Sequence, residues 1–234
     1  MIIGIARSAL LLLVMVLSLA ITITIASYFA IFSKSKIQPY QTAARIWGKF
    51  VVLLFGVQVS VSGRENIPRD RAVFFAANHQ SFADDILILA CIPINFRIVI
   101  AKEHFRLPVF GWGWRKAGYI PITREDPSTL YATIEKMVRA LRAGESVLIF
   151  PEGVRTYDGK VGAFKHASLV PALQSGAPII PIAISGSMHV WPRNSWIVSV
   201  HPVKFTFGKP IYIQSEADYD QKIEEVRAAI SSLL

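Results

Sequence analysis

The chain has 234 residues, enough for one well-buried domain with an appended segment but too few to expect two full domains. Hydrophobic residues make up 53% of the chain and charged residues only 18%, well below the roughly one quarter charged that is typical of soluble domains, and this excess indicates a membrane segment. The net charge of +9 suits an anionic partner, although sign alone does not choose among phospholipid head groups, nucleic acid and an acidic carrier protein.

The first predicted element is a hydrophobic anchor. No residue from Ser8 to Phe32 carries a charge, and the segment is rich in Leu, Ile, Val and Ala. Its length meets the roughly 20 residues needed to cross a bilayer core. A cleaved signal peptide is the alternative, because Arg7 supplies a positive start, but the apolar region of a signal peptide normally has only about 7–15 residues.

Positive charges flank this anchor unequally. Only Arg7 and the amino terminus precede it, whereas four cations follow it: Lys34, Lys36, Arg45 and Lys49. The positive-inside rule therefore predicts that the rest of the chain lies in the cytoplasm. A second apolar stretch, Ile46 to Val61, is typical of a helix lying in the membrane interface. Two helices with Pro39 between them can also form a hairpin that dips into one leaflet, so a full crossing and a hairpin both stay open.

Short apolar runs alternate with helical segments after the anchor. The expected strands are 57–61, 72–76, 96–101, 118–122, 147–150, 179–184 and 203–207. Amphipathic helices are expected over 127–143 and 219–234. The alternation predicts an α/β fold, with membrane-anchoring helices over 1–56 and a single domain over 57–234. The single cysteine, Cys91, excludes an intrachain disulfide and favours a reducing compartment.

His79 and Asp84 form the first candidate site. If the preceding strand ends near Ala77 and a helix begins after Ser81, then Ser81 caps the helix, Asp84 lies in its first turn and His79 faces back towards Asp84. A carboxylate that fixes the imidazole tautomer leaves the other ring nitrogen free to act as a general base. On this pair alone, a capping aspartate and an ordinary loop histidine are the stronger reading. The five histidines are scattered and give no recognisable ligand set, so no metal site is expected.

A second set of polar residues follows the later strands. The run 147–150 leads into Glu152, Gly153 and Arg155, and loops at strand ends are where α/β sheets bind ligands. Gly153 lets the backbone approach a ligand, Arg155 offers a fork for phosphate or carboxylate, and Glu152 accepts hydrogen bonds. A surface turn with a Glu152–Arg155 ion pair is the alternative. Lys102 and Arg124 also follow strands, which suggests an anionic ligand, although a lone cation is usually a solvated surface charge.

Four blocks in this order resemble the 1-acylglycerol-3-phosphate (lysophosphatidic acid) acyltransferase family. They are 78–84 with the His-x-x-x-x-Asp motif, 118–124 (Gly-Tyr-Ile-Pro-Ile-Thr-Arg), 150–156 (Phe-Pro-Glu-Gly-Val-Arg-Thr) and 177–184. The resemblance implies a mixed, mostly parallel sheet flanked by helices, with an amino-terminal helical membrane motif. It also implies acyl transfer from acyl-CoA or acyl-carrier protein to the free hydroxyl of a lysophospholipid, on the cytoplasmic face of a bacterial inner membrane.

In that family's terms, His79 is the base, Asp84 is its partner, and the glycerol-phosphate site consists of Glu152, Gly153 and Arg155 with Arg124 and Lys102. No cofactor and no nucleic acid partner are implied, and the oligomeric state is not indicated.

The sequence departs from the family pattern at three positions. Thr123 stands where an acidic residue usually precedes the arginine, Val154 replaces a threonine, and Ala167 stands where a glycine usually follows the Phe-Lys pair. Relatives with the same centre acylate other lysolipids, so a different acceptor such as a lyso-ornithine lipid remains an alternative. A non-catalytic membrane adaptor and a soluble hydrolase are further alternatives, but the intact His79–Asp84 pair disfavours the first, and the second lacks a Gly-x-Ser-x-Gly elbow.

Overall fold

Seven strands form one central sheet in the computed structural model, which describes residues 2–123 and 127–234. The strands are β1 (Val59–Ser62), β2 (Phe74–Ala77), β3 (Phe96–Ala101), β4 (Ile120–Ile122), β5 (Ser146–Ile149), β6 (Ile179–Ser185) and β7 (Val203–Phe207). They lie in the order β1-β7-β6-β2-β5-β3-β4, and every neighbouring pair is parallel except β6 and β7. The expected mixed, mostly parallel sheet is confirmed, and β3 and β7 have the predicted bounds.

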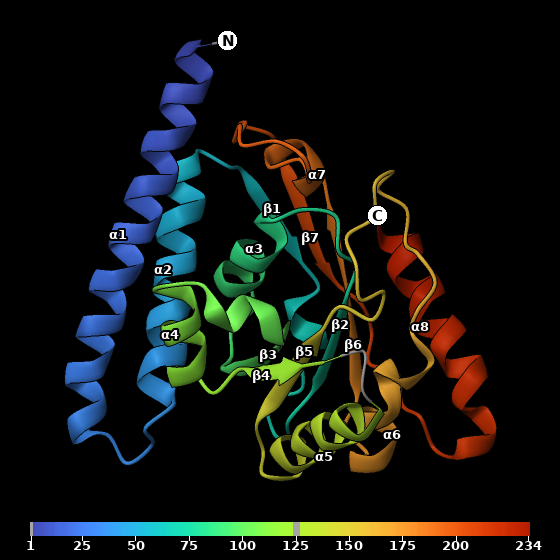
Figure 1. Cartoon of the computed structure of the whole chain (residues 1–234). Coiled ribbons are helices and arrows are strands. Elements are labelled where there is room, and N and C mark those ends of the chain that lie inside the picture. The colour runs from blue at the N-terminus through green and yellow to red at the C-terminus, as the bar shows by residue number, and fades with distance from the viewer. Residues whose placement is uncertain (1, 124–126) are drawn as a thin grey trace.

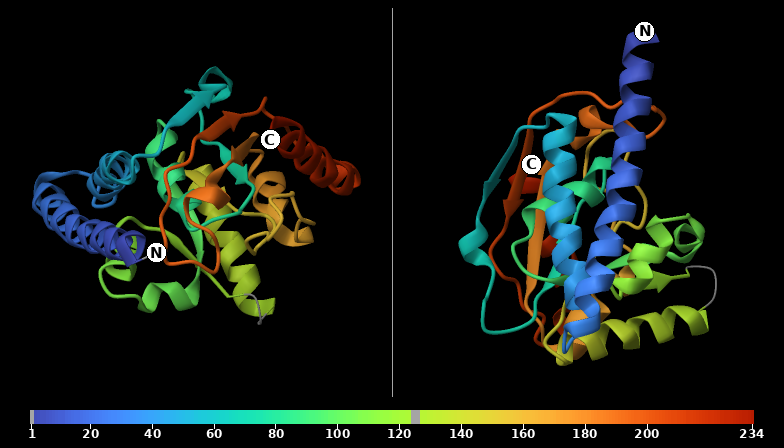
Figure 2. Two further views of the ribbon diagram at one scale, coloured as in Figure 1. Left: turned by 90° about the horizontal axis from the view of Figure 1, so that it is seen from above. Right: turned by 90° about the vertical axis from the view of Figure 1, so that its left-hand side faces the viewer.

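Helices cover both faces of this sheet (Figures 1 and 2). The α-helices are α1 (Ile2–Phe32), α2 (Gln38–Phe55), α3 (Ala83–Cys91), α4 (Phe110–Lys116), α5 (Pro127–Arg142), α6 (Val170–Ser175), α7 (Ser187–Val190) and α8 (Tyr219–Leu233). Short 3-10 turns occur at η1 (Arg64–Asn66), η2 (Lys102–Arg106), η3 (His166–Leu169) and η4 (Glu216–Asp218). Helices α1 to α4 lie on one face, and α5, α6 and α8 lie on the other.

The central strand β2 is buried on both faces. Phe75 and Ala77 belong to the core shared with α1, α2 and α3, whereas Phe74 and Ala76 belong to the core shared with α5, α6 and α8. A strand that is buried on both faces reads as a continuous apolar run instead of an alternating one. This explains why the run before His79 predicted a strand, although the strand begins at Phe74 and not at Ala72.

Helices α1 and α2 form an antiparallel hairpin beside the sheet (Figures 1 and 2). Two expectations about this region are wrong. Pro39 lies in the first turn of α2 and not between the helices. The stretch Ile46 to Val61 is not one helix, because Gly56 adopts a left-handed conformation with φ of 70° that ends α2 and leaves the following residues to form β1.

The inner face of the hairpin is part of the core around the sheet. Gly48 of α2 touches α3 so closely that an added Cβ would lie 2.7 Å from the Leu89 Cβ, so only glycine permits this contact. Trp47 Nε1 donates a hydrogen bond to Ser18 Oγ of α1 at 3.1 Å. Side chains of α1 and α2 share one hydrophobic cluster with α3 and the sheet. The boundary near residue 56 therefore stays a prediction, since the two parts pack as one body.

The outer face of α1 is apolar and exposed. Among the described residues, only this helix is long and apolar enough to cross a membrane, over Gly4–Phe32. Large exposed side chains recur along it: Leu10, Leu13, Leu17, Ile21, Ile25, Phe29 and Phe32. An exposed apolar patch of this extent indicates a contact surface for lipid or protein.

Candidate active site

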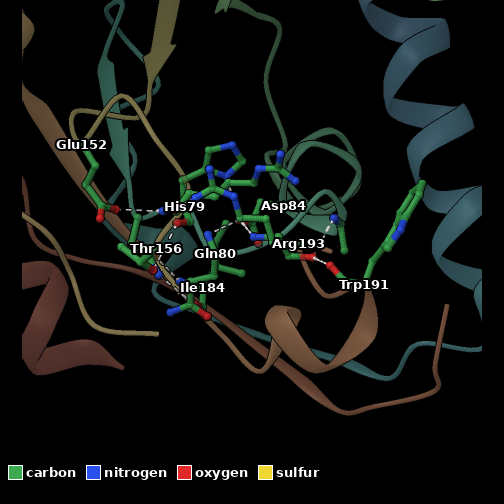
Figure 3. Close-up of polar contacts among 12 residues, drawn as sticks. His79, Gln80, Asp84, Glu152, Thr156, Ile184, Trp191 and Arg193 are labelled. Atoms are coloured by element: carbon green, nitrogen blue, oxygen red, sulfur yellow. Dashed lines mark hydrogen bonds and ion pairs between the residues drawn. The ribbon is translucent and has the colours of Figure 1, made fainter. Parts of the chain in front are cut away.

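The candidate site lies at the carboxyl edge of the sheet. Strands β2, β3 and β5 are mutually parallel neighbours, so the segments that follow them begin at the same edge. His79 follows β2, Lys102 follows β3 and Glu152 follows β5. Arg124, the cation expected after β4, lies outside the described residues. The topology therefore brings two of the predicted blocks together, and Figure 3 shows their polar contacts.

His79 and Asp84 are in direct contact. The His79 Nδ1 lies 2.8 Å from Asp84 Oδ2, and the Asp84 side chain is fully buried. The same carboxylate oxygen accepts hydrogen bonds from the backbone N–H groups of Gln80 at 2.6 Å and Ser81 at 2.8 Å. Three donors on one oxygen, together with a place in the first turn of α3, stabilise a negative charge on Asp84. Beside an ionised carboxylate, Nδ1 carries the proton and Nε2 presents its lone pair.

The predicted helix cap is wrong in detail. Helix α3 begins at Ala83 with Phe82 at the N-cap position. The Ser81 hydroxyl accepts a hydrogen bond from the Ala83 N–H at 3.0 Å and donates one to the carbonyl oxygen of Trp191 at 2.6 Å. Ser81 therefore joins the histidine loop to the segment after α7, in addition to supporting the start of the helix.

Phe150 fixes the plane of the histidine ring. The two rings are stacked, with centroids 3.9 Å apart and an interplanar angle of 16°. The His79 side chain is 16% exposed, and Nε2 has no hydrogen-bond partner among the described residues. The imidazole is thus held by Asp84 at one nitrogen and by Phe150 across its face, which leaves Nε2 for a substrate.

The loop after β5 holds the backbone of His79 at both ends. Glu152 Oε1 accepts a hydrogen bond from the His79 N–H at 2.9 Å, and the Thr156 N–H donates to the His79 carbonyl oxygen at 2.8 Å. Glu152 Oε2 accepts a third bond, from the Gly162 N–H at 2.8 Å. Burial raises the pKa of the Glu152 carboxyl, although the hydrogen bonds from Gly162 and His79 act to lower it.

The place of Glu152 in the glycerol-phosphate site stays a prediction, and the described contacts of its carboxylate are to the backbone. Only 2% of Glu152 is exposed, and both carboxylate oxygens bind backbone N–H groups. Glu152 also makes no ion pair with Arg155, so the alternative of a surface ion pair is not observed. Glu152 is a positioning residue for His79, a relation between distant segments that no local pattern indicated.

We expect Glu152→Gln to disturb this arrangement strongly. An amide has only one acceptor oxygen, so its NH2 group must face either the His79 N–H or the Gly162 N–H. One buried donor then loses its partner, which should cost about 1–3 kcal/mol of unfolding free energy and displace the histidine loop. Chemical denaturation and turnover measurements on the purified chain check this, with Glu216→Gln on an exposed turn as the matched control. Unchanged stability and turnover would contradict the positioning role.

Gly153 and Arg155 lie in the same loop, where Gly153 forms a turn and Arg155 contributes a positive charge. Gly153 has a φ of 72°, a conformation that favours glycine at this turn. The Arg155 guanidinium lies over the Phe82 ring, with Cζ 3.6 Å from the ring centroid. Its Nη1 is buried and has no hydrogen-bond partner among the described residues. Burial lowers the pKa of Arg155, and the nearby charge of Arg193 lowers it further.

Lys102 has fewer contacts with the candidate site than Glu152 and Arg155 have. It is the first residue of η2 and is exposed, with no ion pair in the part of the chain that the structure describes. The same turn carries His104, which lies within electrostatic range of Asp85 at the start of α3. Lys102 thus lies at the predicted edge of the sheet, but no described contact joins it to His79 or Arg155.

The fold and the site define an α/β protein that carries a histidine–carboxylate pair at the carboxyl edge of a mostly parallel sheet. The family model described as Acyltransferase matches residues 58–185, more than half of the chain. The chain therefore belongs to the acyltransferase family.

Curated relatives and a solved structure agree with this assignment. A 1-acyl-sn-glycerol-3-phosphate acyltransferase of Brassica napus is 30% identical over 82% of this chain and 55% of the relative. One of Pseudomonas aeruginosa is 27% identical over 83% of this chain and 80% of the relative. The crystal structure of the 1-acyl-sn-glycerophosphate acyltransferase of Thermotoga maritima superposes with a TM-score of 0.84 at 24% identity, covering 99% of this chain and 96% of that one.

These matches confirm the family predicted from the four sequence blocks. The chain spans about half the length of several of the curated plant relatives. The crystal structure supports the fold, including the amino-terminal helix hairpin, because its alignment covers nearly the whole of both chains.

Proposed function

We propose that the chain transfers a fatty acyl group from an acyl thioester to the free hydroxyl of 1-acylglycerol-3-phosphate, giving phosphatidic acid. The observation that carries the proposal is the His79–Asp84 contact, with Nδ1 bound to a buried carboxylate and Nε2 free. Family membership and the names of the relatives support the reaction class. A non-catalytic adaptor would not need a buried carboxylate to orient an imidazole.

The mechanism follows from this geometry. Nε2 of His79 takes the proton of the acceptor hydroxyl as its oxygen attacks the thioester carbonyl. Asp84 stabilises the imidazolium that forms, because its Oδ2 stays bound to Nδ1. Collapse of the tetrahedral intermediate breaks the carbon–sulfur bond, and the departing thiolate takes the proton from Nε2. The products are the acylated lipid and the free thiol of either coenzyme A or an acyl-carrier protein, and both donors are consistent with this chemistry.

The charged residues near His79 also affect which lysolipid the site can accept. The Asp85 carboxylate, next to Asp84, lies within electrostatic range of His79, His104 and Arg155. Desolvation raises the pKa of this carboxyl, whereas the nearby charge of His79 lowers it. In its ionised form, Asp85 opposes a dianionic phosphate and favours an amine. This specific feature supports transfer to an amine-bearing lysolipid, such as a lyso-ornithine lipid, as the second candidate function.

An acceptor panel with Asp85→Asn separates the two candidates. Purified protein is assayed with labelled acyl-CoA and acyl-carrier protein against lysophosphatidate and amine-bearing lysolipids. If lysophosphatidate is the acceptor, Asp85→Asn should lower its KM about 2–5-fold, the size of an exposed charge interaction. If an aminolipid is the acceptor, the same change should raise that KM. Asp220→Asn on α8 is the matched control, and labelled product with no member of the panel would contradict acyl transfer to lysolipids.

We also propose that the exposed face of α1 attaches the chain to an anionic membrane surface. On the positive-inside rule, the catalytic part then lies on the cytoplasmic face of a bacterial inner membrane. Leu13→Glu with Leu17→Glu should reduce sedimentation with vesicles containing anionic phospholipid by at least about tenfold, because a charge inserted into hydrocarbon costs about 2.5–3.5 kcal/mol. Both leucines are more than half exposed, at 56% and 55%, so the fold should survive.

The matched control places the same charges on the other side of the molecule. Tyr131→Glu with Tyr212→Glu changes two exposed side chains away from the hairpin, at 61% and 44% exposure. It should leave vesicle binding unchanged. Equal loss of binding in both double variants would show that net charge, and not the α1 surface, holds the chain at the membrane.

A further inference from the structure

Arg193 lies outside all four sequence blocks but beside the candidate site. It belongs to the segment between α7 and β7. Its Nη1 donates a hydrogen bond to the carbonyl oxygen of Arg155 at 2.8 Å, and its Cζ lies 4.1 Å from the centroid of the Tyr157 ring. The guanidinium is therefore held against the same loop that carries Arg155, and Figure 3 labels Arg193 among the residues of the site.

The segment that carries Arg193 is also fixed to the histidine loop. The carbonyl oxygen of Trp191 accepts the hydrogen bond from the buried Ser81 hydroxyl at 2.6 Å. The Trp191 ring packs against Phe82, with centroids 5.3 Å apart, and Phe82 in turn lies under the Arg155 guanidinium. Arg193 thus has a defined position relative to both His79 and Arg155.

The two guanidinium groups carry neighbouring positive charges on adjoining segments. Arg155 makes no hydrogen bond with its side chain in the described part of the chain, and its buried Nη1 has no partner. The positive charge of Arg193 is near enough to lower the pKa of Arg155. The carboxylates of Asp84 and Asp85 lie within electrostatic range of Arg155, but no ion pair joins either to a described arginine. Two neighbouring cations with unused donors favour an anion between them.

We propose that Arg155 and Arg193 together bind the phosphomonoester of the lipid acceptor. The proposal rests on the proposed function and adds Arg193, a phosphate-binding residue that lies outside the four sequence blocks. A phosphomonoester has three terminal oxygens, enough for two guanidinium forks, whereas a phosphodiester has two. With the phosphate held there, the acceptor hydroxyl is directed to Nε2 of His79, because one loop fixes both the arginine pair and the histidine backbone.

The test compares Arg193→Gln with Arg193→Lys in the full-length chain. Arg193→Gln removes the charge and should raise the KM for lysophosphatidate about 10–100-fold while leaving the KM for the thioester unchanged. Arg193→Lys keeps the charge and should stay within about fivefold of the wild type. Arg71→Gln, an exposed arginine paired with Asp70 before β2, is the matched control.

Two further readouts separate phosphate binding from a purely structural role. 1-Monoacylglycerol keeps the acceptor hydroxyl and carries a second hydroxyl in place of the phosphate, so Arg193→Gln should not change its slow acylation. Inorganic phosphate should raise the Tm of the wild type and of Arg71→Gln but not that of Arg193→Gln. An equal loss with both acceptors would make Arg193 a brace for the loop and overturn the proposal. A rise in the KM for the thioester alone would indicate that Arg193 binds the acyl donor and not the acceptor phosphate. This result would also overturn the proposal.

The phosphate measurement needs no turnover, so it also separates this inference from the proposed function. Phosphate stabilisation that depends on Arg193, in a chain that does not acylate lysophosphatidate, would support the anion site and reject the acceptor. Acylation of lysophosphatidate with the same acceptor KM in Arg193→Gln and wild type would support the function and reject the site.

Discussion

Replacing His79 with alanine should lower kcat for acyl transfer by about 10²–10⁴-fold, the range that a general base contributes. Nε2 is the free nitrogen of the site, and no other histidine is stacked on Phe150 or bound to Asp84. The side chain is partly exposed and its removal leaves the backbone bonds to Glu152 and Thr156 in place. The fold and membrane attachment should therefore persist, and steady-state kinetics together with circular dichroism check both expectations.

His166→Ala is the matched control for this variant. His166 is an exposed histidine that pairs with Asp220 on the far side of the sheet from α1 and α2. It should retain wild-type turnover. If His79→Ala also retained it, the general-base mechanism would be wrong even though the family assignment would stand.

Asp84→Asn should lower kcat by about 10²–10³-fold without changing the geometry of the site. The atom at the Oδ2 position accepts bonds from two backbone N–H groups as well as from His79. An asparagine must therefore place its oxygen there and its NH2 at the Oδ1 position, which has no hydrogen-bond partner. The imidazole keeps its tautomer, and only the negative charge that stabilises the imidazolium is lost.

Asp84→Asn therefore removes the charge and keeps the acceptor at the Oδ2 position, and its NH2 group lies at a buried position without a described partner, which should cost some stability. The alanine variant also leaves the N–H groups of Gln80 and Ser81 unpaired, so we expect it to lose stability as well as activity. Kinetics and denaturant unfolding of both variants provide the check. If the two lost the same activity and Asp84→Asn were as unstable as Asp84→Ala, the carboxylate would serve the helix start and not the histidine.

The sequence by itself determined which segments form the strands of the sheet. Strands β3 and β7 were found with their bounds, because β3 is a mostly apolar run of strand length and β7 alternates apolar and polar residues. The His79–Asp84 contact was also local, since five residues separate the two and a strand-to-helix turn brings them together. The long uncharged run predicted α1, which is long and apolar enough to cross a membrane.

Only the tertiary structure determines how segments that are distant in sequence come together to form the site. The loop of Glu152 and Thr156 clamps His79 across more than 70 residues of sequence, and Phe150 stacks on its ring. The local sequence around Glu152 does not indicate whether its carboxylate contacts a substrate or a backbone N–H group. The order of the strands in the sheet determines which loop lies beside Glu152. Likewise Arg193 carries no motif, and only the packing of its segment against Ser81 and Phe82 places its charge beside Arg155.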